Sequence, residues 1–146
     1  MTDDKLDLIG LSLNEISETL INKGLIEARE TFRSKQLWHW LYFRGETDFD
    51  KMTTVSKELR KKLKDHFIIR RPKIKSHQIS KDGTQKWLLE LNDSNLIETV
   101  FIPEENRGTL CVSSQVGCTL NCKFCFTGTQ KLVRNLTSGE IISQLL

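Results

Sequence analysis

The chain has 146 residues and a formal net charge of +3, and its length is about that of one domain. Hydrophobic residues make up 38% and charged residues 28%, which excludes a disordered tail or a fibrous repeat. No apolar run approaches the ~20 residues that cross a bilayer, and the acidic N-terminal segment lacks the features of a signal peptide. We therefore expect a soluble cytoplasmic protein that does not associate with membranes.

Charge is distributed unevenly along the chain. Residues 1–31 carry three basic and seven acidic side chains, residues 32–86 carry 15 and six, and residues 87–146 carry four and six. The net charge of +9 in the middle segment is typical of a surface that faces a polyanion. A solvated helix face gives the same composition, and composition alone favours that simpler interpretation.

The first half of the sequence predicts three helices. Ser12 and Glu15 fit a capping box, and apolar residues follow them at helical spacing. A second helix is expected over residues 31–44 and a third from about Thr54, with Pro72 closing the helical region.

The second helix is rich in aromatic residues. At helical spacing we expect most of them to pack in the core rather than to stack on RNA bases: Trp38, Trp40, Tyr42 and Phe43. The histidines have no spacing typical of metal ligands: His39, His66 and His77.

Strand patterns follow the helices. Asp82-Gly83 suits a hairpin turn because both residues tolerate positive φ, and residues 92–95 predict a second turn. A final helix opens at Thr137. The expected strands cover residues 74–79, 85–91, 96–102 and 109–114, and the helix covers residues 141–146.

Three cysteines lie within eight residues: Cys118, Cys122 and Cys125. In a reducing cytoplasm such a cluster indicates metal ligands or reactive thiols rather than disulfides. Three thiolates can hold three irons of a four-iron cluster and leave the fourth iron open. Zinc, with Cys111 as a fourth ligand, and unliganded thiols remain alternatives.

The Cys-x3-Cys-x2-Cys loop after a strand resembles the radical S-adenosylmethionine (SAM) signature. Longer stretches resemble the RlmN family of RNA methyltransferases, and they cover most of the chain: residues 36–42 (QLWHWLY), 47–53 (TDFDKMT), 109–118 (TLCVSSQVGC), 134–137 (RNLT) and 140–142 (EII).

The resemblance implies methylation at C2 of an adenine in large-subunit ribosomal RNA and in some transfer RNAs. Cys118, Cys122 and Cys125 would ligate a [4Fe-4S] cluster whose open iron binds S-adenosyl-L-methionine, and an electron donor protein would supply the electron. The deoxyadenosyl radical would act on a methyl group carried by a protein cysteine, because adenine C2 is not nucleophilic.

The resemblance also implies two catalytic residues. Glu98 matches the base that removes the C2 proton, a role that apolar neighbours would favour. Cys111 matches the cysteine that resolves the covalent RNA–protein adduct. From the residues alone, Glu98 is an outward-facing strand residue, Cys111 is a buried structural thiol, and Arg134 either binds phosphate or pairs with Glu140.

The expected fold class is α+β. A three-helix RNA-binding-like module covers residues 1–72, a β-meander covers 73–108, and the first β/α unit of a truncated radical SAM partial barrel covers 109–146. Family members continue beyond this length and carry the methyl on a later cysteine, so we expect the isolated chain to be inactive. The alternatives are a non-enzymatic RNA-binding module with a zinc-bound or empty cysteine loop, a methyltransferase specific for adenine C8, and an incomplete gene product that does not fold stably.

Overall fold

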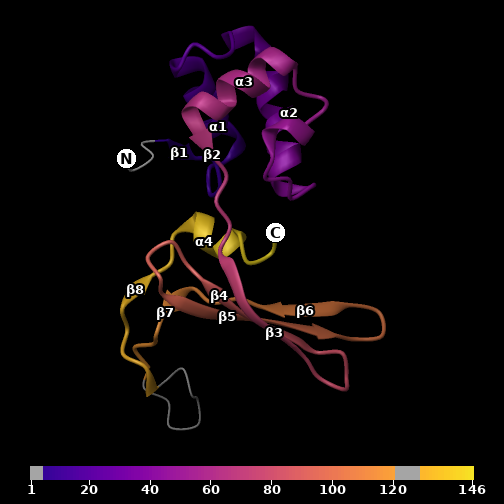
Figure 1. The fold of residues 1–146 in the computed structure, drawn as a ribbon, viewed down its shortest axis with the longest axis vertical. Coiled ribbons are helices and arrows are strands. Elements are labelled where there is room, and N and C mark those ends of the chain that lie inside the picture. The colour runs from indigo at the N-terminus through magenta and orange to yellow at the C-terminus, as the bar shows by residue number, and fades with distance from the viewer. Residues whose placement is uncertain (1–4, 121–128) are drawn as a thin grey trace. The chain divides into compact units, whose positions relative to one another are not determined.

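The computed structural model describes residues 5–120 and 129–146, and its architecture is α+β (Figure 1). The chain forms two compact units. One contains the described residues up to Arg70 and the other runs from Arg71 to Leu145. No helix in the described ranges is long and apolar enough to cross a membrane.

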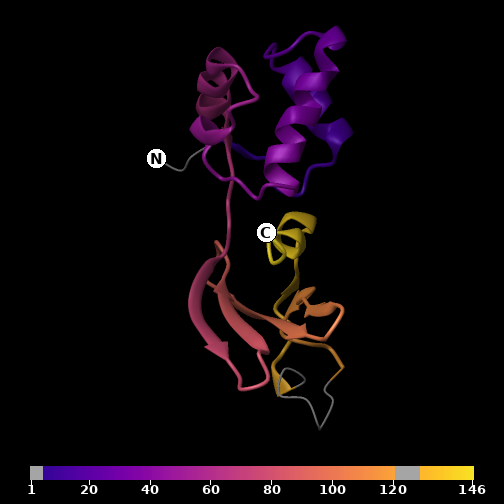
Figure 2. The same ribbon diagram turned by 90° about the vertical axis from the view of Figure 1, so that its right-hand side faces the viewer.

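The first unit is mainly helical. A short parallel pair of strands, β1 and β2, joins the beginning of this unit to its end. Helices α1 and α2 pack directly on each other, and α3 (magenta in Figure 2) packs on η2. The elements are β1 (Leu6–Asp7), α1 (Leu13–Asn22), η1 (Ala28–Glu30), α2 (Thr31–Tyr42), η2 (Phe49–Lys51), α3 (Lys57–His66) and β2 (Phe67–Ile68).

The helix boundaries follow their capping residues. The Ser12–Glu15 capping box is confirmed, because Glu15 N–H donates to Ser12 Oγ and Ser12 N–H donates to the Glu15 carboxylate. The expected start of the third helix near Thr54 is wrong. Ser56 is the N-cap and accepts the Leu59 N–H, so α3 begins at Lys57. This helix also ends well before Pro72, because the chain enters β2.

Thirteen hydrophobic side chains of the helical unit are buried. They come from α1, α2, η2, α3 and β2 and from the segments between these elements, including Leu8 and Ile9 directly after β1. The buried side chains are Leu8, Ile9, Ile16, Leu20, Ile26, Leu37, Leu41, Phe49, Met52, Val55, Leu59, Leu63 and Phe67.

The packing prediction for the aromatic residues of α2 is correct for only part of the set. Trp40 is half-buried and donates its Nε1–H to Thr54 Oγ1 at 2.7 Å, and Tyr42 is half-buried with its hydroxyl bonded to backbone. The prediction is wrong for Phe43 and Trp38, which are 74% and 39% exposed. Helical periodicity identifies the helix, but it does not tell how wide the covered face is.

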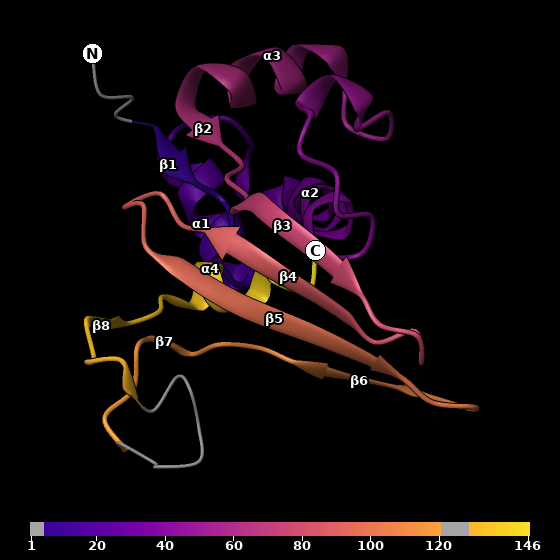
Figure 3. The same cartoon turned by 60° about the horizontal axis from the view of Figure 1, so that its bottom comes forward.

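The second unit is built on a four-stranded antiparallel sheet in the order β3-β4-β5-β6 (Figure 3). Two further strands, β7 and β8, form a small hairpin, and α4 follows it. The elements are β3 (Lys73–Ile79), β4 (Gln85–Glu90), β5 (Leu96–Pro103), β6 (Gly108–Cys111), β7 (Gln115–Val116), β8 (Arg134–Asn135) and α4 (Ser138–Ile142). The strand expected over 109–114 ends at Cys111, and the last helix opens at Thr137 as expected but ends at Ile142 instead of Leu146.

Both predicted hairpin turns are present with three-residue connections. Ser80 and Thr84 close the first turn, and of its residues only Gly83 has positive φ, at 82°. Asp82 tolerates positive φ but does not adopt it here. Asp82 instead accepts the Thr84 N–H with its side chain. In the second turn Ser94 has the positive φ, at 64°.

One face of the sheet is covered by the unit's own core. Ile141 of α4 and Trp87 of β4 pack against a cluster of five buried side chains: Leu89, Leu91, Ile97, Val116 and Leu136. Figure 3 shows α4 lying behind β4 and β5 in that view. Because side chains alternate along a strand, the side chains between these positions face away from the core.

Candidate active site

The cysteine loop leaves and re-enters the sheet unit through the β7–β8 hairpin. Val133 N–H donates to the Val116 carbonyl at 2.8 Å, and Cys118 N–H donates to the Gln130 carbonyl at 3.2 Å. Val116 and Leu136 are buried in the core cluster. The hairpin therefore forms a neck, residues 115–118 and 130–136, that anchors both ends of the loop.

Gly117 makes the close approach at this neck possible. Its φ is 76°, which favours glycine, and a Cβ at this position would lie 2.1 Å from the carbonyl oxygen of Lys131. The backbone therefore turns at Gly117, directly before Cys118.

Cys118 is half-buried directly after this turn, and its Sγ accepts the Leu120 N–H at 3.4 Å. Cys122 and Cys125 lie outside the described residues, and the described ranges contain no group of three side chains that could hold a metal ion. Three closely spaced thiolates fit a [4Fe-4S] cluster chemically, and Cys118 would supply one of them from the anchored end of the loop.

Glu98 and Cys111 lie on the same face of the sheet. Val100 is directly opposite Cys111 in the β5–β6 ladder, and Glu98 is two residues before Val100 on β5. Opposed residues share a face, as do residues two apart on a strand. The buried Ile97 and Thr99 occupy the other face. The two candidate catalytic residues therefore project from the face that the unit's own core does not cover.

Cys111 is more exposed than the residues alone suggested, whereas Glu98 faces outward as they suggested. Cys111 is exposed, so its prediction as a buried structural thiol is wrong. Glu98 is not enclosed by apolar neighbours. Its side chain is 50% exposed, and its carboxylate pairs with Lys86 Nζ at 3.0 Å. The reason is that both residues sit on the uncovered face of the sheet.

Gln144 connects the strand of Glu98 to the segment that leads to the cysteine loop. Its Oε1 accepts from Thr99 Oγ1 and from Ser113 N–H, each at 2.8 Å, and its Nε2 donates to the Ser113 carbonyl at 2.8 Å. Ser113 Oγ in turn donates to the Glu98 carbonyl at 2.7 Å. Sequence reasoning missed this residue, because a lone glutamine near the chain end carries no local signal.

Arg134 pairs with carboxylates instead of remaining available to phosphate. Its guanidinium donates to both oxygens of Glu140, at 2.8 and 2.7 Å, and to Asp93 Oδ2 at 2.7 Å. The hydrogen bonds that Arg134 donates lower the pKa of both carboxyls. The same bonds, to Glu140 first and then to Asp93, raise the pKa of Arg134 above its usual value. This triad ties β8 to α4 and to the β4–β5 turn.

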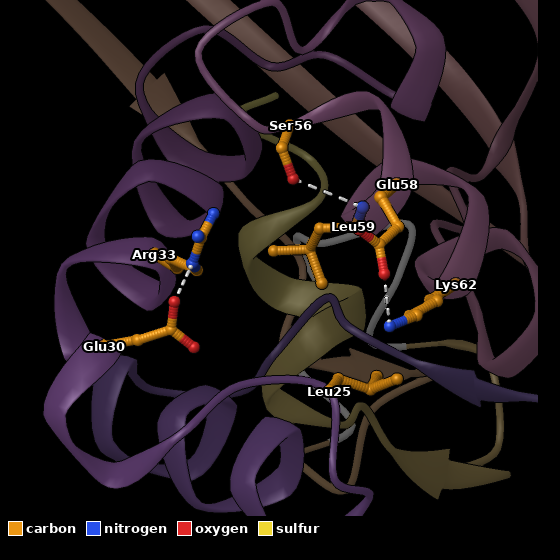
Figure 4. Close-up of a pocket in the computed structure, with 7 residues that line it drawn as sticks. All are labelled: Leu25, Glu30, Arg33, Ser56, Glu58, Leu59 and Lys62. Atoms are coloured by element: carbon orange, nitrogen blue, oxygen red, sulfur yellow. Dashed lines mark hydrogen bonds and ion pairs between the residues drawn. The ribbon is translucent and has the colours of Figure 1, made fainter.

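The helical unit has a surface pocket of about 210 Å³ (Figure 4). Its charges neutralise each other, because Arg33 Nε pairs with Glu30 and Lys62 Nζ pairs with Glu58, each at 2.7 Å. The lining residues are Leu25, Glu30, Arg33, Ser56, Glu58, Leu59 and Lys62. We assign no ligand to this pocket.

Comparisons with known proteins agree with the motifs. Residues 6–69 match the family described as the ribosomal RNA large subunit methyltransferase N-terminal domain. The chain is 57% identical over 150 residues to the dual-specificity RNA methyltransferase RlmN of Chelativorans sp. (strain BNC1), and 58% identical over 148 residues to that of Rhizobium meliloti (strain 1021). These alignments cover 99% and 98% of this chain, but only 37% and 36% of the relatives.

A solved structure of a methyltransferase also resembles this chain. The match to a radical SAM methyltransferase from Sphaerobacter thermophilus covers 96% of this chain and 40% of the chain of that protein. Its TM-score is 0.84, and the two sequences are 37% identical. The chain thus spans less than half the length of the proteins that it resembles. Together the matched N-terminal domain, the identities and the shared fold show that this chain belongs to the RlmN family and corresponds to an N-terminal portion of its members.

Proposed function

We propose that this chain is the N-terminal portion of a cytoplasmic radical SAM methyltransferase that methylates C2 of an adenine in large-subunit ribosomal RNA and in some transfer RNAs. The observation that carries the proposal is the placement of Glu98 and Cys111 on one uncovered sheet face, in a unit that also holds Cys118 at a glycine-dependent neck. The family membership and the names of the relatives support the reaction class.

Each candidate residue has one role in this proposal. Cys118, Cys122 and Cys125 would hold a [4Fe-4S] cluster, and an electron donor protein would supply its electron. Together with S-adenosylmethionine, the cluster would supply the radical chemistry that methylation of adenine C2 requires. Glu98 accepts the C2 proton while the electrons of the C–H bond return to the ring. Cys111 resolves the covalent adduct from a sheet position that solvent reaches.

The segment from residue 109 to residue 146 is the first β/α unit of the radical SAM partial barrel in this proposal. The helical unit binds the RNA through its segment 32–70, which carries ten basic and five acidic side chains. The four cysteines of this chain are Cys111, Cys118, Cys122 and Cys125, and all four have other roles. Because none remains to carry the methyl group, the isolated chain does not complete the reaction.

Anaerobic reconstitution with iron and sulfide tests the proposal. We expect about four irons per chain, the content of one [4Fe-4S] cluster, with an EPR spectrum that shifts on addition of SAM. Cys118→Ala should abolish the signal, and Cys111→Ala, the matched control, should retain it. Stoichiometric zinc, or a cluster lost equally in both variants, would contradict the ligand assignment.

A further inference from the structure

Helix α2 carries a stripe of exposed side chains that its own unit does not cover. Phe32, His39 and Phe43 are spaced by seven and four residues, which places them along one side of a helix. Phe32 is 52% exposed, Phe43 is 74% exposed, and His39 is also exposed. The buried residues of α2, which are Ser34, Leu37 and Leu41, lie on the opposite side.

The rings in this stripe are arranged for stacking. The His39 imidazole and the Phe43 ring are nearly parallel, with centroids 4.7 Å apart and planes inclined by 22°. At the other end of the stripe the Arg33 guanidinium lies 5.2 Å from the centre of the Phe32 ring. The two phenyl rings are eleven residues apart, about 16 Å along a helix, so they would meet different parts of one ligand.

The charge around the stripe indicates the kind of partner. Residues 31–45 contain three basic side chains and no acidic one: Arg33, Lys35 and Arg44. Lys35 is exposed and has no ion pair within the described ranges. Lysine is depleted at protein–protein interfaces, whereas cations interleaved with aromatic rings suit a phosphate backbone with accessible bases.

We infer that the stripe formed by Phe32, Lys35, His39 and Phe43 is an RNA-docking surface on which unpaired bases stack. The inference rests on the proposed function, since it specifies how the helical unit binds RNA. Aromatic stacking tolerates any base, because every base has a π-face, and it requires bases that are not held within a duplex. The stripe therefore selects loops and single-stranded segments over paired stems.

The test is a binding measurement with the 146-residue chain. The probes are a labelled RNA hairpin with a long unpaired loop and a fully paired duplex of the same composition, at one fixed salt concentration. We expect the chain to prefer the hairpin. Phe32→Ala and Phe43→Ala should each weaken hairpin binding by about tenfold, equivalent to about 1.4 kcal/mol, and should leave duplex binding unchanged.

Two further variants separate stacking from general damage. Phe43→Trp retains a stacking surface and should restore hairpin binding. Ile79→Ala, which removes a 65% exposed side chain from β3 outside the stripe, should bind like the wild type. Because Phe32, Phe43 and Ile79 are all on the surface, the amide spectra of the variants should match that of the wild type.

The remaining outcomes overturn the inference in distinguishable ways. If the wild type binds RNA and the two Phe→Ala variants bind hairpin equally well, the stripe is not the docking surface and the proposed function is unaffected. If sedimentation shows a dimer that Phe43→Ala dissociates, a second copy covers the stripe instead. If the wild type binds neither RNA, the proposed RNA recognition by the helical unit fails, and the inference fails with it.

Discussion

The two units of this chain bury their apolar side chains to very different extents. The helical unit buries thirteen hydrophobic residues, whereas the sheet unit buries five among its described residues. The sheet unit covers one face with α4 and leaves the other face, with Glu98 and Cys111, uncovered. The helical unit thus has a closed core, and only its outer surface is left for binding. In the sheet unit, one whole face of the sheet is not covered by the unit's own core.

This difference predicts where a core substitution is most damaging. Leu41→Ala in α2 removes a fully buried side chain and should destabilise the helical unit by about 2–5 kcal/mol. Ile97→Ala in β5 should have a smaller effect, near the lower end of that range, because the thin core around it can partly close the cavity. Hydrogen exchange resolved by residue would measure each unit separately. Equal losses for both variants would contradict the comparison.

The next largest effect is expected at the neck of the cysteine loop. Gly117→Ala places a Cβ against the Lys131 carbonyl in a backbone conformation that favours glycine. We expect a loss of about 1–3 kcal/mol in the sheet unit and reduced iron loading during reconstitution.

Gly83→Ala is the matched control for Gly117→Ala. It has a similar φ of 82°, but its Cβ would meet only the Pro103 side chain, at 3.2 Å, and it lies away from the neck. It should reduce stability and leave the iron content intact. If both variants load iron fully, the neck does not position the loop.

A pH-dependent effect is expected from the Arg134 triad in the sheet unit. The hydrogen bonds from Arg134 lower the pKa of Glu140 below its ordinary value of 4.5, so the folded state favours the carboxylate. The resulting stability is complete above that value and is lost as the pH falls through the lower folded pKa. Melting temperatures measured against pH should therefore fall more steeply below about pH 4.5 for the wild type than for Glu140→Gln. Parallel curves would show that the triad contributes nothing to acid stability.

The parts of this structure that were predictable from the sequence are local ones. The Ser12–Glu15 capping box and the hairpin at Gly83 depend on residues a few positions apart, so their signals are contained in short windows. The cysteine spacing and the family motifs could be recognised for the same reason, since each lies in a short stretch of sequence.

The unpredicted parts depend on contacts that are distant in the sequence. Strands β1 and β2 are too short to show a period, and they pair residues about sixty positions apart, such as Leu6 with Phe67. Gln144 bonds to Thr99 across 45 positions. The exposure of Phe43 and Cys111 was missed for a related reason, since periodicity identifies an element and not the face that its surroundings cover.

The smallest predicted effect concerns the second turn of the sheet unit. Ser94 has a φ of 64°, where an L-residue is strained by about 1–2 kcal/mol and glycine is not. Glycine also increases the entropy of the unfolded chain, which offsets part of the relief. Ser94→Gly should therefore stabilise the sheet unit by no more than about 1 kcal/mol, measurable as a shift of the urea midpoint at constant slope. A destabilised variant would mean that the Ser94 side chain has a compensating role, and that this turn differs from the one at Gly83 in more than its backbone.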